Sequence, residues 1–313
     1  MKVPLKLLSF LDEEDNFFIA THINPEGDAL GSSLALSMAL ESIGKQTTLY
    51  DKDTVPEFYH YLPGREKFTQ AASLHTTLNL PLILLDCNTL DRAGLEGLNF
   101  KYYAVIDHHK TESDFGDIRW VEPEAAATGV MIFYLIKELG IKITREIAIN
   151  LYSAIAIDTG TFRYSSTTAE VLRVAAELIE AGANPAYISQ SLYEAWSEER
   201  FVLLIMALNT LEIRDRVAIT FVTKEMFKKT GTGPEDTESF SSLPRIMKDI
   251  KISAFFREID DNHWKVSLRS RGDINVAGIA TLFEGGGHKN AAGYKIKGSL
   301  EYVKESLLKT ISE

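Results

Sequence analysis

The chain has little cysteine and no long apolar run. Cys87 is the single cysteine among 313 residues, so no disulfide can form within the chain and nothing requires an oxidising compartment. No run of about 18 apolar residues occurs, which argues against a membrane-spanning helix. The N-terminal residues lack the apolar stretch and cleavage site of a signal peptide. From these absences we expect a cytoplasmic protein.

Positive charge is also scarce. The 33 lysines and arginines are outnumbered by 44 aspartates and glutamates, which gives a net charge of −11. Surfaces that bind long nucleic acid are usually basic, so this balance argues against a long duplex as the partner. Short anionic substrates remain compatible, because bound metal cations reverse the local charge inside a cleft.

The order of the apolar segments predicts an α/β protein with two domains. In the first domain, expected over residues 1–190, short strands alternate with helices, which predicts a mostly parallel sheet with helices on both faces. The strands are expected at 17–21, 46–50, 82–86 and 103–107, and the helices at 5–11, 29–43, 127–139, 147–158 and 169–180. A long helix over 186–211 should then lead into a smaller α/β domain, within residues 191–313, with strands at 217–222, 252–256 and 264–268.

Residues of metal-ligand type follow three of the predicted strands and end one predicted helix. In chain order they are His22, Glu26, Asp28, Asp86, Asp107, His108, His109 and Asp158. An open α/β sheet builds its site at the carboxyl ends of its strands, so these side chains should converge. A mixture of carboxylates and imidazoles favours Mn²⁺ or Mg²⁺. Strand alternation predicts that Cys87 points away from the site.

Taken singly, each of these residues has a plain structural explanation. Asp28 could cap a helix beginning at Ala29, and His22 could be a polar residue at the end of a strand. The metal site is favoured by the combination, because four separate segments contribute.

These segments resemble the four signatures of the DHH phosphoesterases. The resemblance rests on the run from His22 to Ser32, on Asp86, on the triplet 107–109 and on the run from Asp158 to Gly160, and it covers nearly the whole chain in the right order. That family includes RecJ nucleases, family II pyrophosphatases and short-RNA nucleases that also dephosphorylate pAp. Its fold would be an N-terminal DHH domain followed by a smaller C-terminal DHHA1 domain.

By position, the resemblance implies two divalent metal ions. One would be held by His22, Glu26 and Asp86, and the other by Asp28, Asp86, His108 and Asp158, so that Asp86 bridges the pair. His109 would be the catalytic residue, as a proton donor or transition-state stabiliser beside the phosphate. Asp107 is expected to orient a neighbouring imidazole. The family usually has Asp where this chain has Glu26, and we expect the longer carboxylate to keep binding metal with altered geometry.

A glycine-rich run over 283–293 is the strongest signal in the C-terminal half. Consecutive glycines let a backbone approach a ligand closely and present N–H groups to an anion. The run resembles the DHHA1 loop that closes over substrate, which implies substrate contacts from Gly286, Gly287, His288 and Asn290. The resemblance also implies that Arg269 contacts phosphates or bases. The family often has a further glycine where this chain has Glu284.

The leading hypothesis is therefore a Mn²⁺-dependent phosphodiesterase, with Mg²⁺ as the alternative ion. It would act as an exoribonuclease that releases mononucleotides from short RNA oligonucleotides, and as a 3′-phosphatase that converts pAp to AMP. Hydrolysis of cyclic di-AMP or pApA needs the same residues and stays open. So do a non-catalytic nucleotide-binding module and a polyphosphate or pyrophosphate hydrolase. The resemblance also makes a homodimer plausible.

Overall fold

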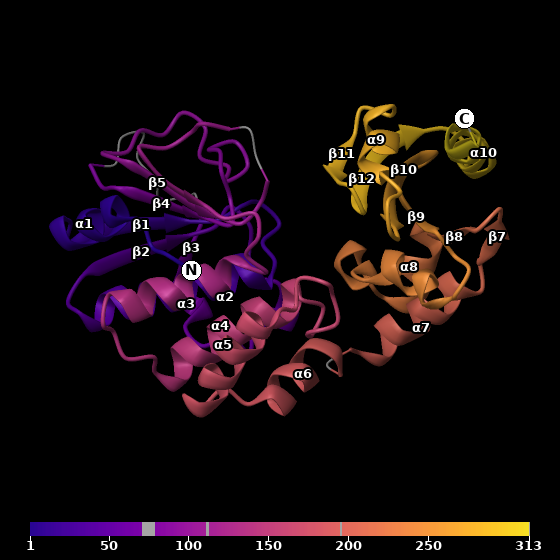
Figure 1. Cartoon of the computed structure of the whole chain (residues 1–313). Coiled ribbons are helices and arrows are strands. Elements are labelled where there is room, and N and C mark those ends of the chain that lie inside the picture. Colours follow the sequence, from indigo (N-terminus) through magenta and orange to yellow (C-terminus); the bar gives the residue numbers. More distant parts are fainter. Residues whose placement is uncertain (71–78, 111–112, 195, 313) are drawn as a thin grey trace. The chain divides into compact units, whose positions relative to one another are not determined.

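The computed structural model describes residues 1–70, 79–110, 113–194 and 196–312, with the backbone alone for His288 and Ser312. The chain divides into two compact units, Met1–Ala195 and Trp196–Glu313 (Figure 1). Each unit has its own sheet and its own buried apolar cores. The predicted α/β class, with a parallel sheet flanked by helices and a second smaller α/β region, is confirmed. In the described part of the chain, no helix has the length and apolar character needed to cross a bilayer.

The first unit contains a parallel sheet of six strands in the order β3-β2-β1-β4-β5-β6. The strands are β1 (Asn16–Ala20), β2 (Gln46–Tyr50), β3 (Phe68–Thr69), β4 (Leu82–Leu85), β5 (Tyr103–Asp107) and β6 (Ile118–Val121). The helices are α1 (Leu5–Glu13), α2 (Gly27–Ser42), α3 (Thr128–Glu138), α4 (Arg145–Asp158), α5 (Ala169–Glu180) and α6 (Pro185–Tyr193). The short strands β3 and β6 were not expected from the sequence.

The two faces of this sheet are covered differently. Phe17 and Ile19 of β1 pack into the core that the helices share, whereas Phe18 packs on the other face against loop residues such as Leu95 and Phe100. The prediction of helices on both faces is therefore wrong for the described residues, in which every helix of this unit packs on the first face. Between β4 and β5 the chain turns through glycines with positive φ, at Gly94 and Gly97, and forms no helix.

Helices α2 and α4 approach each other closely at Gly31. A Cβ atom on Gly31 would lie 2.4 Å from the carbonyl oxygen of Asn150 and 3.2 Å from the Cβ of Ala154. Only glycine therefore fits at this crossing. The contact matters for the site because α2 carries Asp28 in its first turn and α4 ends at Asp158.

The parallel register brings the carboxyl ends of the central strands to one edge. Ala20 of β1 pairs with Leu84 of β4, and Leu85 pairs with Ile106 of β5. Asp86 follows with a φ of +56°, a left-handed conformation that is uncommon for a residue with a side chain. Such backbone strain persists where the surrounding structure enforces it, often at functional sites.

The second unit contains a mixed sheet in the order β11-β12-β10-β9-β8-β7, with β8 and β9 parallel and the other neighbours antiparallel. The strands are β7 (Glu212–Arg214), β8 (Val217–Val222), β9 (Ile252–Asp260), β10 (His263–Ser270), β11 (Gly286–His288) and β12 (Ala291–Lys297). The helices are α7 (Glu198–Leu208), α8 (Lys224–Thr230), α9 (Val276–Thr281) and α10 (Leu300–Ser312), and short 3-10 turns lie at Pro234–Thr237 and Phe240–Ile246. Side chains of α9 and α10 pack on one face, and those of α7 and α8 pack on the other.

The single helix expected over 186–211 is wrong. α6 ends at Tyr193 and α7 begins at Glu198. The side chain of Ser197 accepts a hydrogen bond from the backbone N–H of Arg200, and Glu198 and Glu199 occupy the first turn. A serine followed by acidic residues is a helix-start signal, so the break was readable in the sequence.

We expect the Gly31→Ala variant to be destabilised by about 2–3 kcal/mol, because an added methyl group forces α2 and α4 apart. The free energy of unfolding, measured by urea denaturation, tests this. Gly278→Ala in α9 is the matched control, since its nearest contact would be an ordinary 3.5 Å. That variant should be neutral or slightly more stable, as alanine favours helix. Equal effects of the two substitutions would contradict the packing argument.

Candidate metal centre

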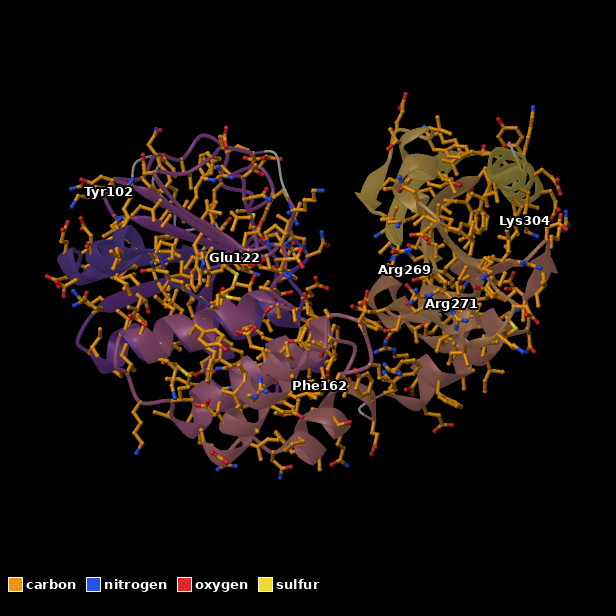
Figure 2. All side chains as sticks on the ribbon, viewed as in Figure 1. Tyr102, Glu122, Phe162, Arg269, Arg271 and Lys304 are labelled. Atoms are coloured by element: carbon orange, nitrogen blue, oxygen red, sulfur yellow. The ribbon has the colours of Figure 1, made fainter. Side chains whose placement is uncertain are left out.

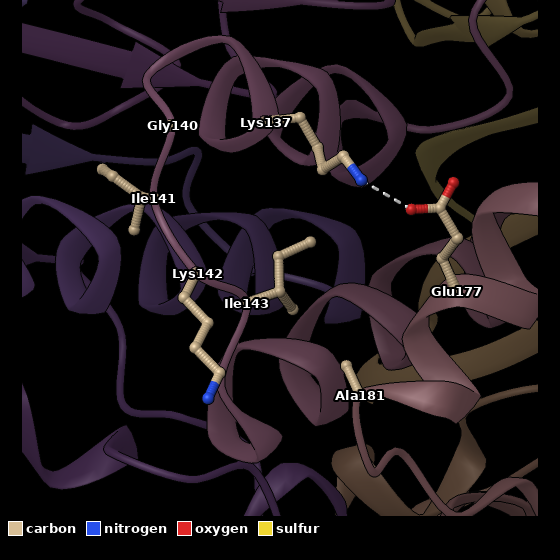
Figure 3. Close-up of a pocket in the computed structure, with 7 residues that line it drawn as sticks. All are labelled: Lys137, Gly140, Ile141, Lys142, Ile143, Glu177 and Ala181. Carbon is tan, nitrogen blue, oxygen red and sulfur yellow. Dashed lines mark hydrogen bonds and ion pairs between the residues drawn. The ribbon is translucent and has the colours of Figure 1, made fainter.

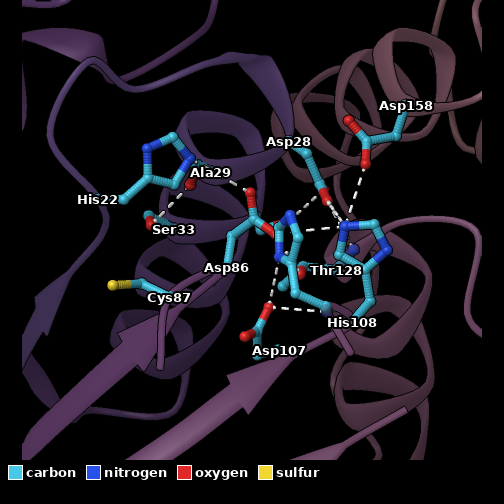
Figure 4. Close-up of polar contacts among 12 residues, drawn as sticks. His22, Asp28, Ala29, Ser33, Asp86, Cys87, Asp107, His108, Thr128 and Asp158 are labelled. Atoms are coloured by element: carbon cyan, nitrogen blue, oxygen red, sulfur yellow. Dashed lines mark hydrogen bonds and ion pairs between the residues drawn. The ribbon is translucent and has the colours of Figure 1, made fainter. Parts of the chain in front are cut away.

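Ligand-type side chains from separate segments of the first unit meet at the carboxyl edge of its sheet (Figure 4). Three groups have ligand atoms that all lie within 4.8 Å of one another. The groups are His22 with Glu26 and Asp86, Asp86 with His108 and His109, and Asp28 with His108 and Asp158. All seven residues that the resemblance assigned to the metal site or to catalysis are thus brought together.

Asp86 lies at the centre of the cluster. Its Oδ2 is 3.5 Å from Nε2 of His22, and its Oδ1 is 3.4 Å from Nε2 of His108 and 3.5 Å from Nδ1 of His109. Burial alone would raise the pKa of this carboxyl, but His22 and the charges of the neighbouring imidazoles lower it to about 2. Asp86 is therefore an anion at any physiological pH, as a bridging ligand must be.

Asp28 is fully buried and joins two helices. It stands in the first turn of α2 and accepts hydrogen bonds from the backbone N–H groups of Thr128 (2.6 Å) and Gly129 (2.8 Å), which begin α3. The hydroxyl of Ser32 donates a third bond at 3.0 Å. Asp28 thus satisfies N–H groups that α3 cannot bond internally, instead of capping its own helix.

Asp158 approaches the same imidazole from α4. Its Oδ2 is 3.1 Å from Nε2 of His108, which is also 3.7 Å from Oδ2 of Asp28. Although burial disfavours a charged imidazole, Asp158, Asp28 and Asp86 together raise the pKa of His108 to about 10. Nδ1 of His108 lies 3.2 Å from the carbonyl oxygen of Ala125, so a backbone partner sets the ring orientation.

The carboxylates of the cluster outnumber the imidazoles that could neutralise them. Burial, and then repulsion from neighbouring carboxylates, raises the pKa of Asp28 and of Asp158. Glu26 is exposed at the surface, yet the protein around its carboxyl and the charges of Asp158 and Asp86 raise its pKa to about 7. Three carboxyls whose ionisation is hindered, next to the ionised Asp86, are an environment that cations would stabilise.

Two buried atoms indicate where a cation fits. Oδ2 of Asp86 and Nε2 of His108 make no hydrogen bond of favourable geometry among the described residues, although buried polar atoms usually make one; Asp158 approaches Nε2 of His108 only as an ion pair. Both belong to the groups defined above, and the donor set is oxygen-rich with some imidazole. The residues present therefore fit divalent cations of the Mn²⁺ or Mg²⁺ type. Cys87 is buried on the other face of the sheet, as alternation predicted (Figure 4).

A hydrogen-bonded chain orients His109. Oδ1 of Asp107 lies 2.8 Å from Nδ1 of His109 and also accepts the backbone N–H of that residue at 3.0 Å. The side-chain amide of Asn88 donates to Oδ2 of Asp107 at 2.9 Å. Asp107 thus orients an imidazole, in keeping with the expectation from the sequence, and Asn88 in turn orients Asp107.

Besides Asn88, sequence reasoning missed Thr128 and Asp51 at this edge. Thr128 donates its hydroxyl to Oδ1 of Asp86 at 3.0 Å, and nothing in its local pattern marked it. Asp51 is buried directly after β2, close enough to His22 to interact with it, and burial raises its pKa to about 7. Asp51 follows its strand as Asp86 follows β4, so the same rule would have found it.

A separate pocket lies elsewhere on the first unit, between the α3–α4 connection and α5 (Figure 3). It is lined by Lys137, Gly140, Ile141, Lys142, Ile143, Glu177 and Ala181. Lys137 and Glu177 form an ion pair of 2.8 Å across it. No candidate ligand of the metal centre lines this pocket, so the pocket is separate from that centre.

The glycine-rich run of the second unit has the backbone that its sequence requires. Gly287 has a φ of +139°, and a Cβ there would lie 2.5 Å from the carbonyl oxygen of Ala291. Glu284, where the family often has glycine, also has a positive φ of +58°. Glu284 thus adopts a left-handed conformation, which favours glycine.

The expected substrate contacts of the second unit differ in their surroundings. The amide nitrogen of Asn290 donates to the hydroxyl of Ser270 (2.9 Å) and to the carbonyl of Gly272 (3.0 Å), so Asn290 holds the neighbouring loop in place. Arg269 is half-buried on β10 and donates to the carbonyl oxygen of Leu268 (Figure 2). Gly286 has open space where a Cβ would stand. The side chain of His288 lies outside the described residues, and the substrate roles of all five residues stay predictions.

Comparison with known proteins covers both units. Residues 16–155 match the family model described as DHH family, N-terminal domain, and residues 211–313 match the DHHA1 domain. A relative from Thermus thermophilus, named bifunctional oligoribonuclease and PAP phosphatase NrnA, is 35% identical over 306 residues, which is 96% of this chain and 90% of the relative. The protein of the same name from Bacillus subtilis is 26% identical, with 93% and 92% covered.

A solved structure supports the fold. The crystal structure of an exopolyphosphatase-related protein from Bacteroides fragilis has a TM-score of 0.93 to this chain at 28% sequence identity. The similarity covers 98% of this chain and 94% of that protein.

The charge crowding predicts a pH-dependent response to metal. The raised pKa values of Glu26, Asp28 and Asp158 mean that the metal-free folded protein keeps protons that the unfolded chain has lost, so its stability should fall from about pH 5 to pH 8. The stability that the ion pairs of His108 contribute declines in the same direction, from its unfolded pKa of 6.5 up to about 10. Mn²⁺ would displace those protons, so the rise in Tm on adding it should be larger at pH 8 than at pH 5.5.

Differential scanning fluorimetry with Mn²⁺ or EDTA measures this rise. At 100-fold excess over Kd, each site should add about 2.7 kcal/mol. The double variant His22→Ala with Asp158→Asn is the control and should lose most of the response. A Tm that is equal with Mn²⁺ and with EDTA at both pH values would refute the metal centre.

Proposed function

The chain belongs to the DHH family, with a DHH domain followed by a DHHA1 domain, and from this premise we propose that it is a metal-dependent phosphoesterase of short nucleotides. Its substrates are RNA oligonucleotides of a few residues, cleaved to mononucleotides, and pAp, converted to AMP. The observation that carries the proposal is the convergence of seven ligand-type side chains at one sheet edge. Support comes from the similarity, over nearly its full length, to a relative named as an oligoribonuclease and PAP phosphatase.

DHH phosphoesterases use divalent metal ions, and this chain has clusters that can bind them. We propose Mn²⁺ as the ion, with Mg²⁺ as the alternative, because carboxylates predominate and imidazoles complete the set. One ion would be held by His22, Glu26 and Asp86. The other would be held by Asp28, Asp86, His108 and Asp158. When bound, such a pair supplies an activated water and neutralises charge on the scissile phosphate.

The remaining chemistry belongs to the protein. His109 would donate a proton or a hydrogen bond to the phosphate from Nε2, with its ring fixed by Asp107 at Nδ1. Thr128 holds the central carboxylate, and the N-terminus of α3 holds Asp28. In the second unit, Arg269, Gly286, Gly287, His288 and Asn290 are proposed to bind the nucleotide.

The proposal extends to partners and location. Short oligoribonucleotides are favoured over long duplexes because the chain carries a net charge of −11. A homodimer and a cytoplasmic location are part of the same proposal, the latter because short RNA and pAp are molecules of the cell interior.

A related activity uses the same groups. Hydrolysis of cyclic di-AMP or of pApA would need the same metal ligands and the same nucleotide-binding loop. A nucleotide-binding module without catalysis is less well supported, because every position proposed as a metal ligand carries a histidine or a carboxylate, Glu26 included.

Parallel turnover assays with Mn²⁺ test the substrate proposal. Five-base RNA and pAp should be hydrolysed at least tenfold faster, by kcat/KM, than cyclic di-AMP. Inorganic pyrophosphate should be a poor substrate, because it offers the second unit no base or ribose. Preference for cyclic di-AMP or pApA would replace the proposed substrate, and no turnover of any compound would refute the enzyme.

His109→Ala should lower kcat by about 10²–10⁴-fold, the usual contribution of a general acid, with metal content unchanged. Asp107→Asn should have a smaller effect on kcat, since it weakens only the positioning of that ring. Metal content by atomic absorption and steady-state kinetics measure both. Loss of metal from His109→Ala would show that His109 is a ligand instead.

A further inference from the structure

Three cations stand side by side across the sheet of the second unit. The antiparallel register places Lys265 of β10 directly opposite Arg257 of β9 on one side and Lys295 of β12 on the other. Directly opposite residues point to the same face, so the three side chains form a line, called here the cation row. Helices α7 and α8 cover this face over β8 and β9, whereas Lys265 and Lys295 are exposed.

The cation row is poorly neutralised by the protein itself. None of the ion pairs or hydrogen bonds found within the described residues includes a side chain of the row. Two carboxylates act from a distance, Glu235 on Arg257 and Glu238 on Lys265. The protein around Lys265, and then its cationic neighbours, still lower the pKa of its ammonium.

Such an arrangement weakens the fold. Like charges directly opposite each other on neighbouring strands are destabilising, and here two such pairs share Lys265. In a chain with a net charge of −11, a line of cations on one sheet face is an exception to the general composition. An anionic ligand that bridges the three side chains would turn the repulsion into attraction.

The next row holds only small residues on β10, β12 and β11, whereas on β9 it holds Phe255, which is buried in the core with α7. Ser267 pairs with Gly293, and Gly293 pairs with Gly286. A Cβ on Gly293 would lie 2.9 Å from the carbonyl oxygen of Val266, so glycine is required there. One row further stands Arg269, opposite Ala291. A low strip of small residues is thus bordered by the cation row on one side and by Arg269 on the other.

We propose that the cation row binds the phosphate backbone of an oligonucleotide, beyond the nucleotide that Arg269 and the glycine-rich run are proposed to hold. This proposal rests on the proposed function and explains how the length of the oligonucleotide would be recognised. Successive rows are about 7 Å apart and neighbouring strands about 4.8 Å apart, so long lysine and arginine side chains can reach more than one phosphate. Backbone contacts carry no sequence information, so the preference is for length and not for bases.

Binding of labelled five-base RNA to the full chain in EDTA tests the site without hydrolysis. In Lys265→Gln with Lys295→Gln, the Kd by fluorescence anisotropy should rise about tenfold. The slope of log K against log salt should shrink by about 1.4, because each lost single-strand phosphate contact removes about 0.7. The Tm of this variant should be unchanged or higher, since repulsion is relieved, which separates lost binding from lost folding.

Lys309→Gln is the matched control. It removes one lysine charge, as each substitution of the double variant does, but on α10, which packs against the opposite face of this sheet. This variant should leave the Kd for RNA unchanged. With Mn²⁺ present, the double variant should raise the KM for five-base RNA about tenfold and leave the kinetics with pAp within twofold.

Three results would overturn the site: an unchanged Kd in the double variant, an equal loss in Lys309→Gln, or an equal loss of activity on pAp and on five-base RNA. Failure of the parent protein to hydrolyse any substrate would instead refute the proposed function. The anisotropy measurement distinguishes the two cases, because it does not depend on catalysis.

Discussion

Uncompensated negative charge is the constraint around which the first unit is organised. Glu26, Asp28, Asp86 and Asp158 crowd a small volume with three imidazoles, and three of these four carboxyls have raised pKa values. Asp86 alone stays readily ionised, because the histidines gather around it. A fold that holds such groups together without cations gives up stability, and a pair of divalent ions would restore it. The same side chains thus link folding to the proposed chemistry.

The protein resists this repulsion by fixing the ends of its elements. Gly31 lets α2 and α4 touch, which fixes the helices that carry Asp28 and Asp158. Asp86 is held in a left-handed turn beyond β4. The second unit shows a similar case, since the three cations of the cation row repel one another across the sheet and would be stabilised by a bound anion. In both units, like charges lie close together at the positions where we propose that ligands bind.

The sequence predicted which residues converge in the candidate metal centre, because the ends of parallel strands meet at one edge and a short motif therefore specifies a place in space. Thr128 could not be predicted in this way, since it reaches Asp86 through the docking of α3 and through no pattern of its own. The alternation of strands and helices predicted helices on both faces, but the segment between β4 and β5 turns through Gly94 and Gly97 and covers the second face as a loop. The cation row was hidden for another reason. It depends on antiparallel register between residues up to about 40 positions apart, and no local motif carries that information.

Asp28 combines two tasks that are usually divided between residues. It is a candidate ligand, and it is also the acceptor for the first N–H groups of α3. Evolution therefore cannot adjust the chemistry at this position without also loosening a helix. Even the closest replacement, asparagine, would offer α3 one acceptor oxygen where aspartate offers two. A related protein that had lost catalysis would still need this aspartate to hold α3. The presence of Asp28 in a sequence is therefore weaker evidence of activity than the presence of Asp158, which ends α4 and accepts no hydrogen bond from the start of another helix.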